Sequence, residues 1–205
     1  MLKLIKRISV LSVFVLLVMG FSFSADARGL GKKGDLAVGG DIMLGGATKP
    51  MSGADGGFAF GIEPMVMVFP IDNLAIFTRM PFWERQFSSF SAGGFSVDLD
   101  IDYFPFLFGA RYYYTIPSLK AMQIYGGGAI GATVGTSGSG LGGTGSSSYF
   151  SIDMHFGGQY EVIDNLGIDF NFDIYMPNIG PRSGGEKVVA RFGVMGGVFY
   201  HFSIF

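Results

Sequence analysis

Residues 166–176 read Leu-Gly-Ile-Asp-Phe-Asn-Phe-Asp-Ile-Tyr-Met, and this stretch decides the fold class. Every second residue is a large apolar side chain, and the residues between them are glycine, tyrosine or polar. A period of two predicts a β-strand with one apolar face and one polar face. About 9–11 residues in a tilted strand are enough to cross the hydrocarbon core of a bilayer. The stretch therefore predicts one strand of a membrane-spanning barrel.

The same alternation recurs along the chain and predicts an all-β, antiparallel up-and-down barrel of eight strands. The expected strands cover residues 35–46, 57–69, 74–83, 95–114, 122–134, 149–162, 166–176 and 187–205. Longer connections are expected at 47–56, 84–94, 135–148 and 177–186, and short turns at 70–73, 115–121 and 163–165. Long and short connections alternate, as they do in outer-membrane barrels with short periplasmic turns and longer external loops.

Two of the short turns share a repeated sequence. Ile-Asp-Asn-Leu-x-Ile occurs at residues 71–76 and again at 163–168, each time between alternating runs. Asp and Asn favour turns because their side chains bond the local backbone and Asn tolerates positive φ. Both copies therefore predict tight β-hairpins.

The strand expected at 95–114 contains a change of phase. Its apolar residues have odd numbers up to Tyr103 and even numbers from Phe106 onward. We interpret this as a β-bulge at Phe104-Pro105, where proline is tolerated inside a strand. The alternative is a turn at Pro105, which would add a strand. With the bulge, Asp98, Asp100 and Asp102 face the lumen.

The N-terminus has the pattern of a secretory signal peptide over residues 1–27. Lys3, Lys6 and Arg7 precede an apolar run from 8 to 23, and Ala25-Asp26-Ala27 is a small-residue cleavage site. An N-terminal membrane anchor is the alternative. We expect cleavage before Arg28, export through the periplasm and a mature barrel over residues 28–205.

Composition narrows the class of protein further. The leader carries three bases and one acid, so the net charge of −2 becomes about −4 in the mature chain, which excludes a basic nucleic-acid footprint. There is no cysteine, so the fold forms without disulfides. The rival to a membrane barrel is a soluble, lipocalin-like barrel. Soluble surfaces are about a quarter or more charged, whereas this chain is 15% charged with almost no lysine in its strands.

Strand count, loop asymmetry and a final strand ending in Phe205 together resemble the small eight-stranded outer-membrane barrels of Gram-negative bacteria, the OmpA/OmpX type. This resemblance spans the mature chain. It implies a monomer in the bacterial outer membrane, surrounded by membrane lipid and lipopolysaccharide. It also implies insertion by the barrel-assembly machinery through the C-terminal strand.

Under this interpretation the lumen collects charged residues that must pair because they are buried. Glu63 is expected opposite Arg79, Arg79 near Asp98 or Asp100, and Asp173 opposite Arg191 across the last hairpin. The predicted lumen network is Glu63, Arg79, Asp98, Asp100, Asp102, Arg111, Asp173 and Arg191. His155 is expected to pair with Asp153 or Asp173.

Two chemical alternatives are weaker. Asp98, Asp100 and Asp102 could gather a hard cation such as Ca²⁺, but the lumen face of a strand is the simpler interpretation. His201-x-Ser203 resembles the His-x-Ser pair of outer-membrane lipid A deacylases, yet both residues are expected to face inward near the periplasmic end. We therefore predict no metal, no cofactor and no catalytic site. The expected role is structural or surface-interactive, and the alternative is a narrow channel for small cations or small apolar solutes.

Overall fold

The computed structural model describes residues 31–49, 55–80, 83–92, 95–119, 121–139, 144–179 and 188–203. The expected leader over residues 1–27, its cleavage site, Lys187 and Phe205 lie outside this part of the chain and stay predictions. Among the described residues, no helix is long and apolar enough to span a bilayer.

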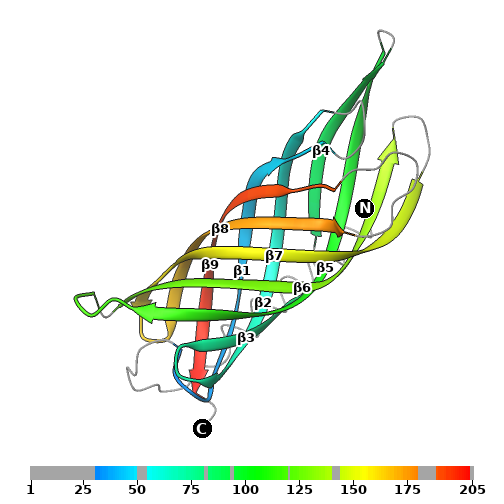
Figure 1. Cartoon of the computed structure of the whole chain (residues 1–205). Coiled ribbons are helices and arrows are strands. Elements are labelled where there is room, and N and C mark those ends of the chain that lie inside the picture. Colours follow the sequence, from blue (N-terminus) through cyan, green and yellow to red (C-terminus); the bar gives the residue numbers. More distant parts are fainter. Residues whose placement is uncertain are drawn as a thin grey trace, which may run out of the picture.

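The described chain forms nine strands joined in one antiparallel sheet. The strands are β1 (Asp35–Ala47), β2 (Gly57–Ile71), β3 (Leu74–Arg79), β4 (Trp83–Ala92), β5 (Phe95–Thr115), β6 (Met122–Ser139), β7 (Thr144–Ile163), β8 (Leu166–Ile179) and β9 (Arg191–Ser203). β1 pairs with both β2 and β9, so the sheet closes on itself (Figure 1).

β3 and β4 are two segments of a single barrel strand. Both lie between β2 and β5, with β3 alongside Met65–Ile71 and β4 alongside Phe58–Ile62 of β2. Counted this way, the ring has eight positions. This confirms the predicted eight-stranded up-and-down barrel.

The predicted loop at 84–94 is wrong, because β4 extends to Ala92 and pairs with β5 as far as Ala92↔Phe95. Likewise, β6 and β7 extend into the predicted 135–148 loop and pair up to Gly138↔Thr144. The β4–β5 and β6–β7 hairpins reach furthest beyond the ring, at the end opposite the end of β9 (Figure 1). The predicted strands are too short because the serine and glycine residues in these segments are also typical of loops.

The predicted bulge at Phe104-Pro105 is also wrong. β5 pairs with β6 without a break from Leu99↔Ser139 to Thr115↔Gln123. The change of phase lies instead between β3 and β4. Arg79 is buried in the lumen, and the next buried residue that the structure describes is Glu84. The two residues are five positions apart, an odd number, so inward residues change from odd to even numbers there. The sequence has Pro81 in between, and proline has no amide hydrogen to donate to a ladder.

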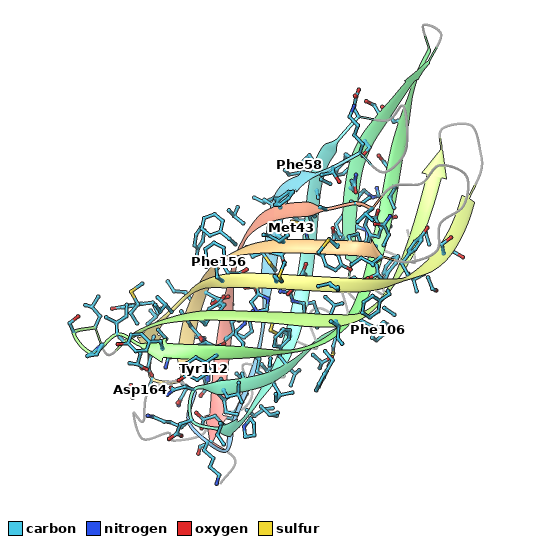
Figure 2. The ribbon with its side chains drawn as sticks, in the orientation of Figure 1. Met43, Phe58, Phe106, Tyr112, Phe156 and Asp164 are labelled. Carbon is cyan, nitrogen blue, oxygen red and sulfur yellow. The ribbon has the colours of Figure 1, made fainter. Side chains whose placement is uncertain are left out.

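The two repeated turns form as predicted. Asn73 and Asn165 have φ of 65° and 67°, the left-handed conformation that asparagine tolerates better than most residues. Each asparagine closes a tight connection, between β2 and β3 and between β7 and β8. Figure 2 shows Asp164 at the second of these turns, at the same end of the barrel as the end of β9.

The barrel is apolar outside, and its lumen holds charged and polar side chains together with buried apolar ones. Phe58, Phe106, Tyr112 and Phe156 are each at least 52% exposed and point away from the ribbon, whereas Met43 lies inside it with no exposed surface (Figure 2). Further exposed apolar side chains are Ile42, Phe108, Ile130, Phe170, Phe172, Phe192 and Val198. A soluble barrel would have the reverse arrangement, so the lipocalin-like alternative is wrong.

Candidate functional site

The candidate site is a network of charged side chains across the lumen. Each member sits at an inward position of its strand, because residues on one face of a strand recur at every second position. Members on strands that are not neighbours meet across the narrow interior. The buried ionisable side chains at its centre are Glu63 (β2), Arg79 (β3), Glu84 (β4), Arg111 (β5), Asp153 and His155 (β7), Asp169 and Asp173 (β8), and Arg191 (β9).

Arg79 is the hub of one half of the network. Its Nη1 lies 3.0 Å from Glu63 Oε2, 3.0 Å from Asp153 Oδ2 and 3.3 Å from Asp173 Oδ2. Only 1% of the Arg79 surface is exposed. The Arg79 guanidinium therefore links β3 to its neighbour β2 and also to β7 and β8 across the lumen. An ion pair between neighbouring strands alone would link only two strands.

Arg191 forms the second hub and shares acids with the first. Its Nη groups lie 2.5 Å from Glu84 Oε2, 2.5 Å from Asp173 Oδ1 and 3.4 Å from Glu63 Oε1. The guanidinium also stacks over the ring of Tyr175 at 4.6 Å from its centroid. Because Glu63 and Asp173 contact both arginines, the two hubs form one connected network.

Arg111 lies closer to the periplasmic end and is held mainly by rings. Its guanidinium is 4.3 Å from the centroid of Tyr125 and 5.5 Å from that of Phe77. Its Nε donates to His155 Nε2 at 3.0 Å, which requires that the histidine proton sits on Nδ1. That Nδ1 lies 2.5 Å from Asp153 Oδ1 and donates to it. The chain Arg111–His155–Asp153 thus links this arginine to the Arg79 hub.

The sequence-based site list is partly reproduced in space. Glu63, Arg79, Asp173 and Arg191 come together, and Arg111 joins them through His155 and Asp153. Glu84 belongs to the network but was not on the list, because its segment was interpreted as a loop. The alternation of Glu84, Gln86 and Ser88, all buried, is the signal that would have found it.

The prediction that Asp98, Asp100 and Asp102 face the lumen is wrong. Since β5 has no change of phase, these residues share the outward face with Phe106 and Phe108, and Asp98 is exposed. The expected contact of Arg79 with Asp98 or Asp100 is wrong for the same reason.

Asp102 instead pairs with Arg85 on the outside of the β4–β5 hairpin. Arg85 Nε and Nη2 donate to the two carboxylate oxygens at 2.7 and 2.9 Å, and Trp83 Nε1 donates to the same carboxylate at 3.0 Å. The hydrogen bond to Asp102 raises the pKa of Arg85. This partly exposed cluster fixes the base of the external hairpin.

Structures of known proteins show the same architecture. Neisserial surface protein A matches with a TM-score of 0.59 at 16% identity, over 83% of this chain and all of that one. The outer membrane protein OprG from Pseudomonas aeruginosa matches with a TM-score of 0.55 at 13% identity, over 86% and 99%. Ail, the attachment invasion locus protein of Yersinia pestis, matches with a TM-score of 0.52 at 15% identity, over 83% and 99%.

The fold is that of the small outer-membrane β-barrels. Together with the outward apolar belt, it places the protein in the bacterial outer membrane, as the sequence predicted. No protein-family model matches the sequence, and no curated protein sequence matches it. Identities this low establish the fold and transfer no residue roles.

His201 and Ser203, two residues apart on β9, have different surroundings. His201 is buried and its Nε2 lies 3.0 Å from Gln159 Nε2, whereas Ser203 is exposed. His201 Nδ1 has no hydrogen-bond partner among the described residues, so no acid orients the ring there. Also among the described residues, no group of three or more His, Asp or Glu is arranged to hold a metal ion.

Proposed function

We propose that the protein is a closed outer-membrane barrel that presents its external hairpins for interaction at the cell surface. The observation that carries this proposal is the burial of Arg79, Arg111 and Arg191, none of which is more than 1% exposed. An eight-stranded barrel is only wide enough for its own side chains. Three arginines bonded across such a lumen leave little room for a continuous water path.

An aromatic layer supports the same interpretation at the periplasmic end. The ring of Phe69 lies 5.7 Å from Tyr113 and 5.8 Å from His201, and Tyr113 lies 5.1 Å from Tyr125. The segment that precedes β1 is bonded to the turn between β2 and β3, because Asn73 N donates to Gly31 O at 2.9 Å. The lumen thus has an apolar floor below its charged network.

The purified protein in a planar lipid bilayer is expected to give no steady ionic current. The reason is that conduction would require the buried ion pairs to separate and admit water, at a cost of several kcal/mol for each charge left unpaired. A steady, cation-selective current would contradict the proposal. It would favour the alternative of a narrow cation pathway, since the buried acids outnumber the buried arginines.

The interacting part of the molecule is, in this proposal, the long β4–β5 hairpin. The Arg85–Asp102 pair and the Trp83 hydrogen bond stiffen its base. A rigid hairpin loses less conformational entropy on binding than a free loop does. Ail is by name an attachment protein, which makes attachment the first interaction to test.

Replacing residues 89–98 with Asn-Gly should abolish attachment of producing bacteria to epithelial cells while the barrel still folds. Ser88 and Leu99 are paired, so a two-residue turn can join them without changing the register. Folding is checked by the shift in SDS mobility on boiling. The matched control replaces Arg85 with lysine and keeps the hairpin. Unchanged attachment by the shortened barrel would overturn the surface-interaction role.

A further inference from the structure

The acids of the lumen are not all accounted for by its arginines. The described residues include seven buried carboxylates but three buried arginines. One of these carboxylates, Asp41 on β1, is 1% exposed and accepts no hydrogen bond on either oxygen from a described residue. An ionised carboxylate in such a place is costly unless something else neutralises it.

The residue next to Asp41 across the sheet has no side chain. Asp41 is paired with Gly197 on β9, and Gly197 is paired with Asp169 on β8, so a glycine separates two inward acids. A Cβ at Gly197 would overlap both Gly40 O and Asp41 Oδ1, so the Asp41 carboxylate lies over the glycine. No side chain therefore stands between this carboxylate and Asp169 on the next strand.

Several buried oxygens of these side chains lack hydrogen-bond donors. Asp169 Oδ2 accepts from Tyr125 at 2.5 Å and from Asn171 Nδ2 at 3.0 Å and lies 3.8 Å from Arg111 Nη1, whereas its Oδ1 has no hydrogen-bond partner among the described residues. Asn171 Oδ1, on the amide that contacts Asp169, also has none. With the two oxygens of Asp41, four buried acceptors of Asp41, Asp169 and Asn171 have no hydrogen-bond donor among the described residues.

From this arrangement we propose that Asp41, Asp169 and Asn171 form a buried site for one hard cation beside Gly197. Carboxylate and amide oxygens are the ligands that Ca²⁺ and similar cations take in proteins. A single proton on Asp41 would donate to only one acceptor, whereas a cation binds several oxygens at once. The cation also offsets part of the excess negative charge, and it closes the lumen further.

The test measures Ca²⁺ binding to the purified full barrel by equilibrium dialysis in choline chloride, with Asp41→Asn as the variant. Wild type is expected to bind one Ca²⁺, and Asp41→Asn to lose this binding. Asp102→Asn is the matched control, since it removes one acid from the outer surface and should bind as wild type does. Binding by Asp41→Asn equal to wild type would overturn the site.

Thermal unfolding in detergent provides the second readout and separates the possible occupants. Ca²⁺ or Na⁺ should raise the unfolding temperature of wild type and Asp102→Asn above its value in choline, and should not raise that of Asp41→Asn. An effect of Na⁺ alone identifies a monovalent occupant of the same site. If no cation binds or stabilises wild type, and acid pH alone does, a proton occupies Asp41 and the proposal fails. Asn171→Ala, which removes one oxygen and no charge, should weaken the cation effect if Asp41→Asn does not fold.

Discussion

Arg79→Ala is expected to destabilise the folded barrel by about 3–5 kcal/mol, the usual cost of removing one partner from a buried charge cluster. Arg79 contacts Glu63, Asp153 and Asp173 within 3.3 Å, and all three carboxylates are buried. The variant leaves them with less compensation in a lumen that already has excess acid. Most of the lost stability comes from burying these three carboxylates without a counter-charge, and less comes from the lost attraction between them and Arg79.

The measurement is the free energy of unfolding in urea in lipid vesicles, followed by the fluorescence of Trp83, the single tryptophan of the chain. Arg85→Ala is the matched control, because Arg85 also pairs with an aspartate but is partly exposed on the external hairpin. An exposed ion pair contributes at most about 1 kcal/mol. Equal losses for the two variants would show that the lumen charges are solvated, and would remove the basis of the closed-barrel proposal.

The fold was predictable because a membrane barrel repeats one simple pattern. Lipid on one side and a packed lumen on the other impose the period of two, which is unbroken in residues 166–176. Both Asp-Asn turns were predictable as well, because their chemistry is local. Neither feature depends on which strands meet across the lumen.

The site was less predictable, for two physical reasons. First, alternation does not show in which strand the change of phase lies, so the acids of residues 98–102 were predicted in the lumen although they lie on the outward face of β5. Second, contacts such as Arg79 with Asp153 join strands that are not neighbours, and register along a hairpin does not reveal them. Glu84 was missed because residues 84–94 were interpreted as a loop.

Phe172→Arg is the second large effect, with an expected cost of about 2–4 kcal/mol, as for arginine on the lipid face near the bilayer midplane. Phe172 is 45% exposed in the middle of the outward series of β8. Its ring stacks on Phe156 at 5.3 Å and meets Phe170 edge-on at 5.7 Å. The charge must therefore enter hydrocarbon and also disturb an aromatic cluster.

Two matched variants separate these contributions in the same unfolding assay. Phe172→Leu removes the ring contacts without adding charge and should lose about 0.5–1.5 kcal/mol. Ser146→Arg places the same charge at an exposed position on the external part of β7 and should change stability by no more than about 0.5 kcal/mol. If Phe172→Arg cost no more than Phe172→Leu, the outward face of β8 would be in water. Since β8 is the strand with the clearest alternation, that result would reverse the assignment of inside and outside for the whole barrel.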